Sequence, residues 1–444
     1  MVGTTDCTRK SARVKVNGTE VPTVDTSQHE DPAISTQVRT DGPASVTRIS
    51  DIFIPAYWRG ENVFNSLPLD ASSEITVPVT VQTRPPQGST YERNWRTVHY
   101  GWLRKIGSGG EGRLLRLKVA DYANIANNTP VTKTWTDSSY RTILDWTVKR
   151  LNEKDGFPTV QLGSTPVTEP DEPTSDPVSP LSPMAIRDFI ATSIFGEIPT
   201  ASFNATEKDT VADVLNWLAE QTGLDWWFEP TSSGLVLMFT DLSNTTRSWD
   251  ARNVGGDLYV RDNRALYSID PINTLSVIGG QINGVVKEGG EGTSVSNLYV
   301  TATATNEKLL ANAGGQINEK VIRGSYSDLD AAKNVAKKKL QEEIRSGGEG
   351  EMVVDGHPSI FLNNTITSKP LCGEYVSGDV PEVTYSVKSV RHEAPATGRY
   401  NTVTSVGMYV DEDNITVSGG YGDNEGDVLY QPDEVAVPAS EVDL

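Results

Sequence analysis

Apolar and polar residues alternate around a turn signal near the start of this chain, and this pattern constrains the fold most. The stretch ARVKVNGTEV, residues 12–21, alternates on both sides of Asn17-Gly18, a strong local signal for a β-hairpin. Comparable runs rich in β-branched residues follow, separated by Gly, Pro, Asn and Asp clusters, at 33–40, 45–54, 75–83 and 113–119. The N-terminal region is therefore predicted to be a small β-barrel or sandwich.

Helical spacing replaces this alternation in four places. The apolar residues between 138 and 152 recur every three or four positions, and Ser138 is placed to cap that helix. Weaker or longer helical patterns follow at 184–195 and 327–345. From residue 258 to residue 410 the strand pattern otherwise returns, and from 411 to 444 the chain is acidic and Gly-rich, so some of that tail is expected to be mobile.

The stretch TVADVLNWLAEQTGLDWWFEP contains the clearest helix, because both of its ends are marked. Thr210 and Asp213 have the spacing of a capping box, and Gly223 suits a left-handed stop. An aromatic strand and a hairpin partner at 235–240 come next. The motif Val214-Leu215-Asn216-Trp217 also resembles residues 143–146. A duplicated architecture and a chance match both explain so short a similarity.

The charge balance excludes some partners. The chain of 444 residues has 59 acidic and 39 basic residues, for a net charge of -20, which argues against binding to nucleic-acid backbones or anionic membranes. Survival in strong salt and ordinary acidity explain this excess equally well. No apolar run approaches the roughly 20 residues of a membrane span, and no signal peptide is expected. Cys7 and Cys372 are interpreted as structural thiols.

Motifs for chemistry are weak throughout. The run GSGGEG, residues 107–112, matches G-x-G-x-x-G, but the strand-like RLLRLKVAD follows where a nucleotide site needs a helix. The segment GGYGDNEGD, residues 419–427, departs from a calcium-binding repeat and occurs once. The four histidines, at 29, 99, 357 and 392, lack metal-ligand spacing, and no G-x-S-x-G motif is present. We therefore predict no catalytic, cofactor-binding or metal residue and no cofactor.

Two further clusters have structural explanations. Lys337, Lys338 and Lys339 are expected to lie on a solvated helix face or to form ion pairs across an interface. The aromatic run Trp226-Trp227-Phe228 is expected to lie in the core.

Taken together, several segments resemble the baseplate hub, or late control, protein family of tailed viruses. They are VKVNGTEV, the stretch TVADVLNWLAEQTGLDWWFEP with GLVLMFTD, NTLSVIGGQINGVV, and DAAKNVAKKKLQEEI leading into GEMVVDGHPSIFLNNTI. The resemblance covers about residues 12–410 and depends on element order. It implies a mainly β fold with an α+β insertion, that is, two tube-type β-barrel domains plus a helix-containing domain.

The resemblance also implies a domain organisation. An N-terminal β-barrel domain with a following helix would occupy 1–165, a Pro-rich linker 166–183, an α+β domain 184–257, and a second β-barrel domain with one helix 258–410. Residues 411–444 form the acidic C-terminal tail, which is too short for a catalytic domain.

The implied function is that of a non-enzymatic homotrimer at the distal end of a virion tail. It would join the sixfold tail tube or distal tail protein to a threefold tip with spike or fibre proteins. Tape-measure protein and DNA would pass through transiently, without stable nucleic-acid binding, during genome ejection. An acidic channel would let DNA slide, and a virus of haloarchaea, assembled in the host cytoplasm, would explain the composition.

Two other functions compete with this one. A virion-associated glycosidase or peptidase that degrades the host envelope would show activity on host surface material, although no residue can be nominated for it. A β-rich surface adhesion protein would need an export signal, and the sequence shows none.

Overall fold

A computed structural model describes the fold of most of the chain. It covers residues 11–24, 32–41, 45–58, 61–62, 77–85, 94–108, 114–154, 157–163, 200–204, 206, 208–231, 234–240, 242, 247–251, 256–267, 271–288, 291–324, 326, 329–368, 382–396, 400–422, 428–430 and 435–436. The Pro-rich linker at 166–183, the predicted helix at 184–195, both cysteines and His29 lie outside these residues.

The N-terminal strands form the first barrel, in the order β3-β4-β9-β8-β7-β1, with β2 beside β1. The predicted hairpin is present, and Asn17 and Gly18 turn it with φ of 48° and 79°. Alternate residues face inward, as the sequence pattern predicts. The strands are β1 (Ala12–Val16), β2 (Thr19–Val21), β3 (Ile34–Asp41), β4 (Ser45–Pro55), β7 (Pro78–Thr83), β8 (Arg96–Ser108) and β9 (Leu114–Ala120), with a small β5 (Tyr57–Trp58) and β6 (Glu61–Asn62) pair.

Six later strands form the second barrel, in the order β16-β22-β25-β24-β23-β15. An isolated bridge between Ala251 and Leu258 brings the end of β15 beside the approach to β16. Trp249, Met352 and Ile366 are buried in its core. The strands are β15 (Ser248–Ala251), β16 (Val260–Asn263), β22 (Glu351–Asp355), β23 (Thr365–Ser368), β24 (Val383–Ala394) and β25 (Asn401–Met408).

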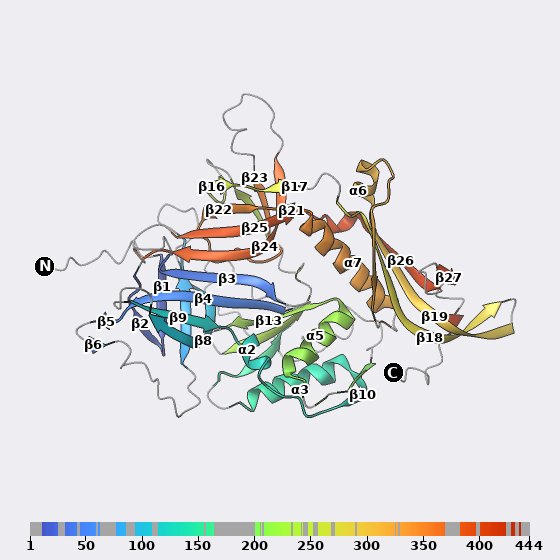
Figure 1. Ribbon diagram of the computed structural model, residues 1–444, viewed down its shortest axis with the longest axis horizontal. Coiled ribbons are helices and arrows are strands. Elements are labelled where there is room, and N and C mark those ends of the chain that lie inside the picture. The colour runs from blue at the N-terminus through green and yellow to red at the C-terminus, as the bar shows by residue number, and fades with distance from the viewer. Residues whose placement is uncertain are drawn as a thin grey trace, which may run out of the picture.

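The two barrels share one continuous sheet, because β3 pairs with β24. The antiparallel ladder runs from the pair Ile34 and Ala394 to the pair Val38 and Val390. In Figure 1, β24 and β25 of the second barrel lie directly alongside β3 and β4 of the first. The fold is thus mainly β with two barrels and a helix-containing region, as predicted.

An α+β region packs beside the barrels around a core of its own. The capping box of Thr210 and Asp213 and the left-handed stop at Gly223, with φ of 71°, are both confirmed. The predicted cap at Ser138 is wrong by one residue: β10 continues to Ser139, whose hydroxyl accepts from the Thr142 amide. The elements are α2 (Ala123–Ala126), β10 (Trp135–Ser139), α3 (Tyr140–Asn152), β11 (Val160–Gly163), β12 (Thr200–Phe203), α5 (Val211–Thr222), β13 (Asp225–Pro230) and β14 (Leu235–Thr240).

A strand–helix unit occurs twice in this α+β region. β10 leads into α3 and β12 precedes α5, and the two strands pair antiparallel, with Trp135 opposite Phe203. The ring of Trp135 lies 5.0 Å from that of Trp146 on α3, and the ring of Phe203 lies 5.0 Å from that of Trp217 on α5. The similar motifs around these two tryptophans therefore occupy matching places.

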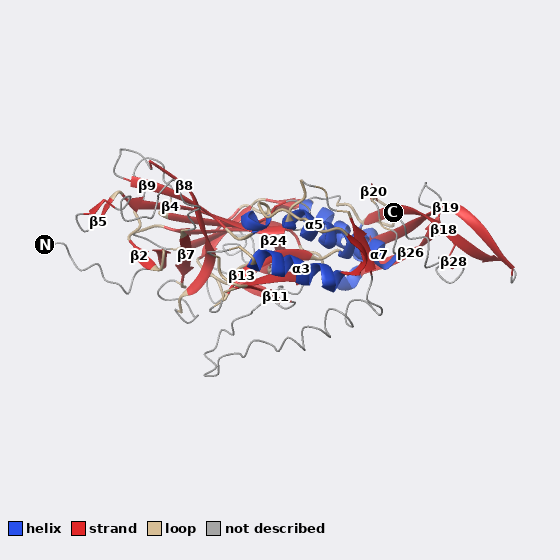
Figure 2. Cartoon of the chain, turned by 90° about the horizontal axis from the view of Figure 1, so that it is seen from below, coloured by secondary structure: helices blue, strands red, loops and turns tan. Residues whose placement is uncertain are grey.

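A third sheet is inserted between β16 and β22, and α7 covers one of its faces. Its long β18–β19 hairpin projects from the rest of the molecule (Figure 2). β26, from within the predicted tail at 411–444, pairs with β19, while the domain boundaries themselves stay predictions. The elements are β17 (Leu266–Tyr267), β18 (Thr274–Glu288), β19 (Glu291–Asn306), α6 (Glu307–Asn312), β20 (Glu319–Arg323), α7 (Leu329–Ser346), β21 (Gly348–Glu349), η3 (Glu412–Asn414), β26 (Ile415–Gly422), β27 (Val428–Tyr430) and β28 (Val435–Ala436).

Packing at the barrel junction predicts a strict requirement for glycine at position 356. A Cβ on Gly356 would lie 2.1 Å from Cδ1 of Tyr400, whose side chain is fully buried. We expect Gly356→Ala to lower the free energy of unfolding by about 1–3 kcal/mol, as overpacking usually does. Chemical denaturation measures this. The control is Gly107→Ala, whose Cβ meets nothing within 4 Å, and equal stability of the two variants would contradict the prediction.

Candidate functional site

The two barrels are built on one plan. Along the sheet, the order β3-β4-β9-β8-β7 corresponds strand by strand to β16-β22-β25-β24-β23. β1 and β15 come next in the two orders but run in opposite directions, because β1 pairs antiparallel with β7 and β15 pairs parallel with β23. The corresponding strands also follow one another in the same order along the chain. We call strands and residues at the same place in this order equivalent. Equivalent strands leave equivalent edges and faces, and these are the candidate functional surfaces.

The register of hydrogen bonds makes the equivalence specific to single residues. The β8–β9 hairpin shifts register between Leu103 and Lys105, and the β24–β25 hairpin shifts between Val387 and Ser389. Just before each shift, the strand also donates a backbone hydrogen bond on its other side, to the residue that precedes the neighbouring strand. The Leu103 amide donates to the Val77 carbonyl oxygen, before β7, over 3.0 Å, and the Val387 amide donates to the Asn364 carbonyl oxygen, before β23, over 2.9 Å. The two β-bulges therefore coincide, and each carries a basic residue, Arg104 in the first barrel and Lys388 in the second.

The two bulge residues have different surroundings. Lys388 Nζ donates to the carbonyl oxygen of Gly348, 2.7 Å away, beside the inserted sheet. Burial lowers the pKa of Lys388, and nearby Glu349 opposes this shift. Arg104 is exposed and forms no ion pair within the described residues of the chain.

The outer face of the joined sheet is polar across both barrels. One row of paired residues crosses seven strands, from the first barrel to the second, and all its members are exposed or half-buried. It contains basic residues at one end and acidic residues toward the other. The row is Lys105, Lys118, Asp51, Ser35, Glu393, Asn401 and Asp355.

The inner face carries a buried polar row across the same junction. Ser50 accepts or donates toward Thr36 over 2.7 Å and lies 2.6 Å from Nδ1 of His99. Ser50, Thr36 and His99 are all 0% exposed. A serine and a histidine at this distance have the geometry of a nucleophile and its base, but their complete burial keeps substrate away. We interpret the pair as structural.

A second buried cluster lies on the other side of the junction. The Tyr400 hydroxyl is 2.7 Å from His392 Nδ1 and accepts from the Thr83 hydroxyl of the first barrel over 3.3 Å. Burial, followed by the nearby Arg48 cation, lowers the pKa of both His99 and His392 to about 3. Burial also raises the pKa of Tyr400. These groups are therefore neutral at physiological pH and act as hydrogen-bond partners: His99 bonds within the first barrel, His392 within the second, and Tyr400 bonds across to Thr83.

Arg48 connects this junction to the α+β region. Its guanidinium is 5% exposed, donates to the Phe228 carbonyl oxygen over 2.7 Å and pairs with Glu229 over 2.8 Å. The Arg48 backbone amide donates to Asp121 over 2.7 Å. One buried cation is thus satisfied by groups from the strand β13, while its own backbone is fixed by the segment that leaves the first barrel.

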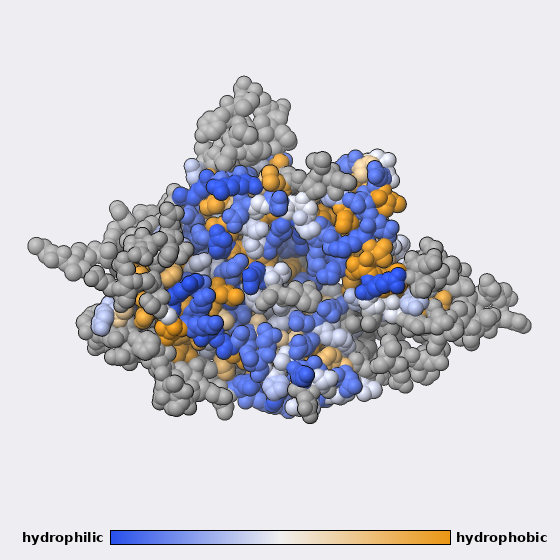
Figure 3. Space-filling view, viewed as in Figure 1, coloured by the Kyte–Doolittle hydropathy of each residue, from blue (hydrophilic) through white to orange (hydrophobic). Residues whose placement is uncertain are grey.

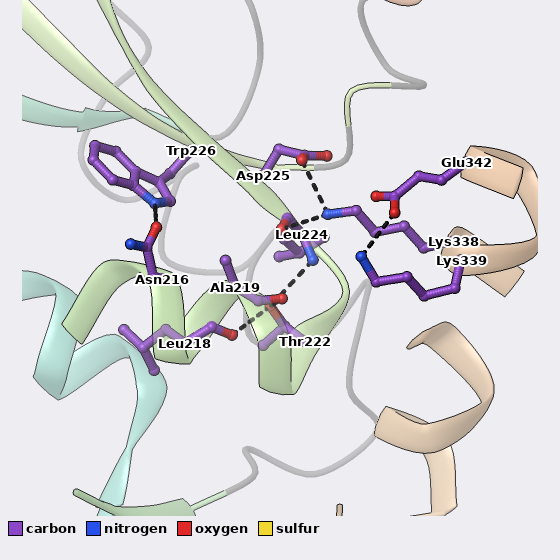
Figure 4. A network of polar contacts seen from close by, with 10 residues as sticks. All are labelled: Asn216, Leu218, Ala219, Thr222, Leu224, Asp225, Trp226, Lys338, Lys339 and Glu342. Carbon is purple, nitrogen blue, oxygen red and sulfur yellow. Dashed lines mark hydrogen bonds and ion pairs between the residues drawn. The ribbon is translucent and has the colours of Figure 1, made fainter. Parts of the chain in front are cut away.

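A buried ion pair joins α7, beside the inserted sheet, to the start of β13, directly after α5 (Figure 4). Lys338 Nζ lies 2.9 Å from Asp225 Oδ1 and donates to the Leu224 carbonyl oxygen over 2.9 Å. The side chains of Lys338 and Asp225 are 17% and 6% exposed. The prediction that the lysine cluster forms ion pairs is confirmed, since Lys337 pairs with Glu412 and Lys339 with Glu342.

The motifs singled out in the sequence have structural roles where they are described. Gly107 lies in β8, and among the described residues the element that follows the glycine run is the strand β9 and not a helix. Trp226, Trp227 and Phe228 are buried in β13, as predicted. Among the described residues no group of three or more His, Cys, Asp or Glu could hold a metal ion.

The face of the molecule drawn in Figure 3 is mostly hydrophilic where it is described. Figure 3 shows apolar side chains only in small separate patches on this face of the molecule. The most exposed large apolar residues include Leu266, Ile317 and Val321. None of the described helices has the length and apolar character needed to cross a membrane.

Comparison with known proteins identifies the fold but no family. No protein-family model matches the chain, and no curated protein matches its sequence. The 43 kDa tail protein of prophage MuSo2 from Shewanella oneidensis is similar in structure, with a TM-score of 0.50, 13% identity, and coverage of 91% of this chain and 99% of that one. At this identity the similarity shows a shared fold.

Two other solved structures have lower scores. A tail protein from Neisseria meningitidis MC58 has a TM-score of 0.49 and 12% identity, over 90% of this chain and 96% of that one. The E. coli c3393 protein, a type VI secretion component described as similar to T4 tail proteins gp27 and gp5, has a TM-score of 0.46 and 10% identity, over 90% of this chain and 77% of that one.

The buried histidines predict loss of stability in mild acid. Their pKa is about 3 in the folded chain against an ordinary value of 6.5, so between these limits the unfolded chain binds more protons. Stability therefore falls as pH drops below about 6.5. The two histidines together should cost about 2–3 kcal/mol between pH 7.5 and 5.5. Urea denaturation at several pH values measures this, and equal stability at pH 7.5 and 5.5 would contradict it.

The ion pair between α7 and β13 predicts a strong effect of a single lysine. Replacing Lys338 by Met leaves the buried Asp225 carboxylate without its cation, which should cost about 3–5 kcal/mol of stability. Lys339→Met removes a pair whose side chains are 34% and 39% exposed, so it should cost under about 1 kcal/mol. Denaturation of both variants tests the contrast, and similar losses would show that burial does not determine the effect.

Proposed function

We propose that this chain is a structural hub protein at the distal end of a viral tail. Three copies would form a ring that joins a sixfold tail tube to a threefold tip and encloses a conduit for genome ejection. The observation that carries this proposal is the presence of two equivalent barrels on one continuous sheet. Three such chains present six equivalent barrels, which is the number that a sixfold tube requires.

The fold shared with a prophage tail protein supports the same setting. In this proposal the other partners are a tail tube or distal tail protein and spike or fibre proteins. Tape-measure protein and DNA pass through, and the protein resides in the virion. No enzymatic role is proposed, because the Ser50 and His99 pair, which most resembles catalytic geometry, is buried.

The outer face of the joined sheet is suited to line the conduit. A wall that faces water must be polar, and the row from Lys105 to Asp355 is polar along its whole length. The resemblance led us to expect an acidic channel, yet this face carries both signs of charge. Mixed charge offers a polyanion no continuous basic track, so DNA would pass without being held.

The acidic excess fits the proposed host. With 59 acidic and 39 basic residues, the chain would keep a net negative, hydrated surface in strong salt, where charges are heavily screened. We therefore propose a virus of salt-loving archaea as the source.

The decisive experiment is the mass of the purified chain in molar salt, by light scattering coupled to size exclusion. We expect a species of three times 48.2 kDa that appears as a ring in electron micrographs. Dilution should shift the mass toward the monomer without passing through larger species. A monomer at every concentration, or a ring of another copy number, would contradict the proposal.

A further inference from the structure

Part of one edge of β8 lacks a neighbouring strand among the described residues, whereas the same part of the equivalent strand, β24, pairs with β3. The first half of β24 pairs with β23 inside its barrel, and its second half, from Val390 to Ala394, pairs with β3. β8 follows the same plan up to a point: residues 96–102 pair with β7. Beyond Arg104, that edge of β8 has no strand partner among the described residues. Among the described strands, an edge equivalent to the one that binds β3 is therefore unpaired.

The matching partner is β17, as the register shows. Lys118 is equivalent to Ser405 by the bulges, so their neighbours Asp51 and Glu351 are equivalent too. Two residues further back along each strand, Ile49 of β4 is equivalent to Glu349 of β21. Its partner Gln37 in β3 is therefore equivalent to Leu266 in β17. In the same way, the pair of Val38 and Arg48 is equivalent to the pair of Tyr267 and Gly348. β17 thus occupies the place of the segment of β3 that binds β24. Its other edge has no strand partner among the described residues.

Gln37 and Leu266 occupy equivalent positions, and their side chains differ in exposure as expected if β3 has a partner strand and β17 lacks one. Gln37 is half-buried, because β24 covers it with Arg391 directly opposite. Leu266 is 61% exposed, although it is the apolar member of the two. An apolar residue this exposed on an open strand edge is a liability unless a partner covers it.

We propose that neighbouring copies join by antiparallel pairing between β17 of one copy and the second half of β8 of the next, which repeats the β3–β24 junction between chains. The inference rests on the proposed ring and names its contact. Equivalence fixes the register: Gly107 of one copy lies opposite Leu266 of its neighbour, as Arg391 lies opposite Gln37 within the chain. The contact joins unlike surfaces, so it can close a ring head to tail.

The charges beside the two edges are complementary. Arg104 and Lys105 are exposed on the β8 side and form no ion pair within the described residues of the chain. On the other side, the exposed Glu349 lies one strand beyond Leu266. Docking of a second copy therefore brings Arg104 and Lys105 toward Glu349, and it also pairs the backbone edges of β8 and β17.

A disulfide trap tests this register. In a chain with Cys7→Ser and Cys372→Ser, the pair Gly107→Cys and Leu266→Cys should place two Cα atoms about 4.5–5.5 Å apart across the interface, within disulfide range. Oxidation in molar salt should yield covalent dimers and trimers and no longer species. Mixing the two single-cysteine chains should yield covalent dimers, whereas either chain alone should yield none.

The control pair is Gln37→Cys with Arg391→Cys, which should close within one chain and leave the mass unchanged. If native rings form and the control closes, but Gly107→Cys and Leu266→Cys do not link, the interface is wrong while the proposed function stands. If no ring forms under any condition, the proposed function itself fails. Linkage of Gly107→Cys chains to each other would overturn the head-to-tail contact in favour of a symmetric one.

A charge substitution gives an independent readout. Leu266→Arg would bring a cation against Arg104 and Lys105 of the neighbour, and we expect the ring to dissociate at a concentration at least about tenfold higher than the parent chain requires. Ile317→Arg is the matched control, because Ile317 is 62% exposed and belongs to neither edge strand but to the segment between α6 and β20. Equal effects of the two substitutions would overturn the proposal.

Discussion

The backbone ladder between β3 and β24 is the contact on which the rest of the structure depends. It joins strands from opposite ends of the chain and converts two barrels into one sheet. Its register is fixed by the residues beside it, because a slip by one position would exchange the two faces. Arg391 and Glu393 would then enter the interior, and His392 would leave it. The buried row through Thr36, Ser50 and His392 therefore specifies the alignment as well as stabilising it.

The polar character of that buried row has a physical reason. Hydroxyl and imidazole groups buried without partners would destabilise the fold, and here Thr36, Ser50, His392 and Nδ1 of His99 each have a partner, whereas Nε2 of His99 has none among the described residues. Arg48 extends the same arrangement to β13, and Lys338 does so between α7 and the start of β13. The barrels, the α+β region and the inserted sheet are thus joined to one another by directed polar contacts, which hold relative positions more strictly than apolar packing alone.

Local patterns in the sequence predicted the local structure well. The turn at Asn17-Gly18, both ends of α5 and the buried aromatic strand all follow from residues close together in the chain. β8 was missed, because Gly101 and the bulge at Arg104 interrupt its alternation. The β3–β24 junction and the equivalence of the barrels depend on pairing between distant segments. No short motif encodes such pairing, and the candidate contact at Leu266 depends on the registers of both barrels together.

In the proposed ring, the place of the inserted sheet would let one chain fit both a sixfold and a threefold arrangement. In the first barrel β4 follows β3 directly, whereas in the second the whole β18–β19 unit with α7 is inserted between the equivalent strands. The short β17–β21 pair at the base of the insertion preserves the strand edge that corresponds to β3. The sheet can therefore repeat twice per chain while the projecting hairpin occurs once. Three chains would then present a wall of six similar units and three projections, which reconciles a sixfold tube with a threefold tip through a single interruption of an otherwise repeated barrel.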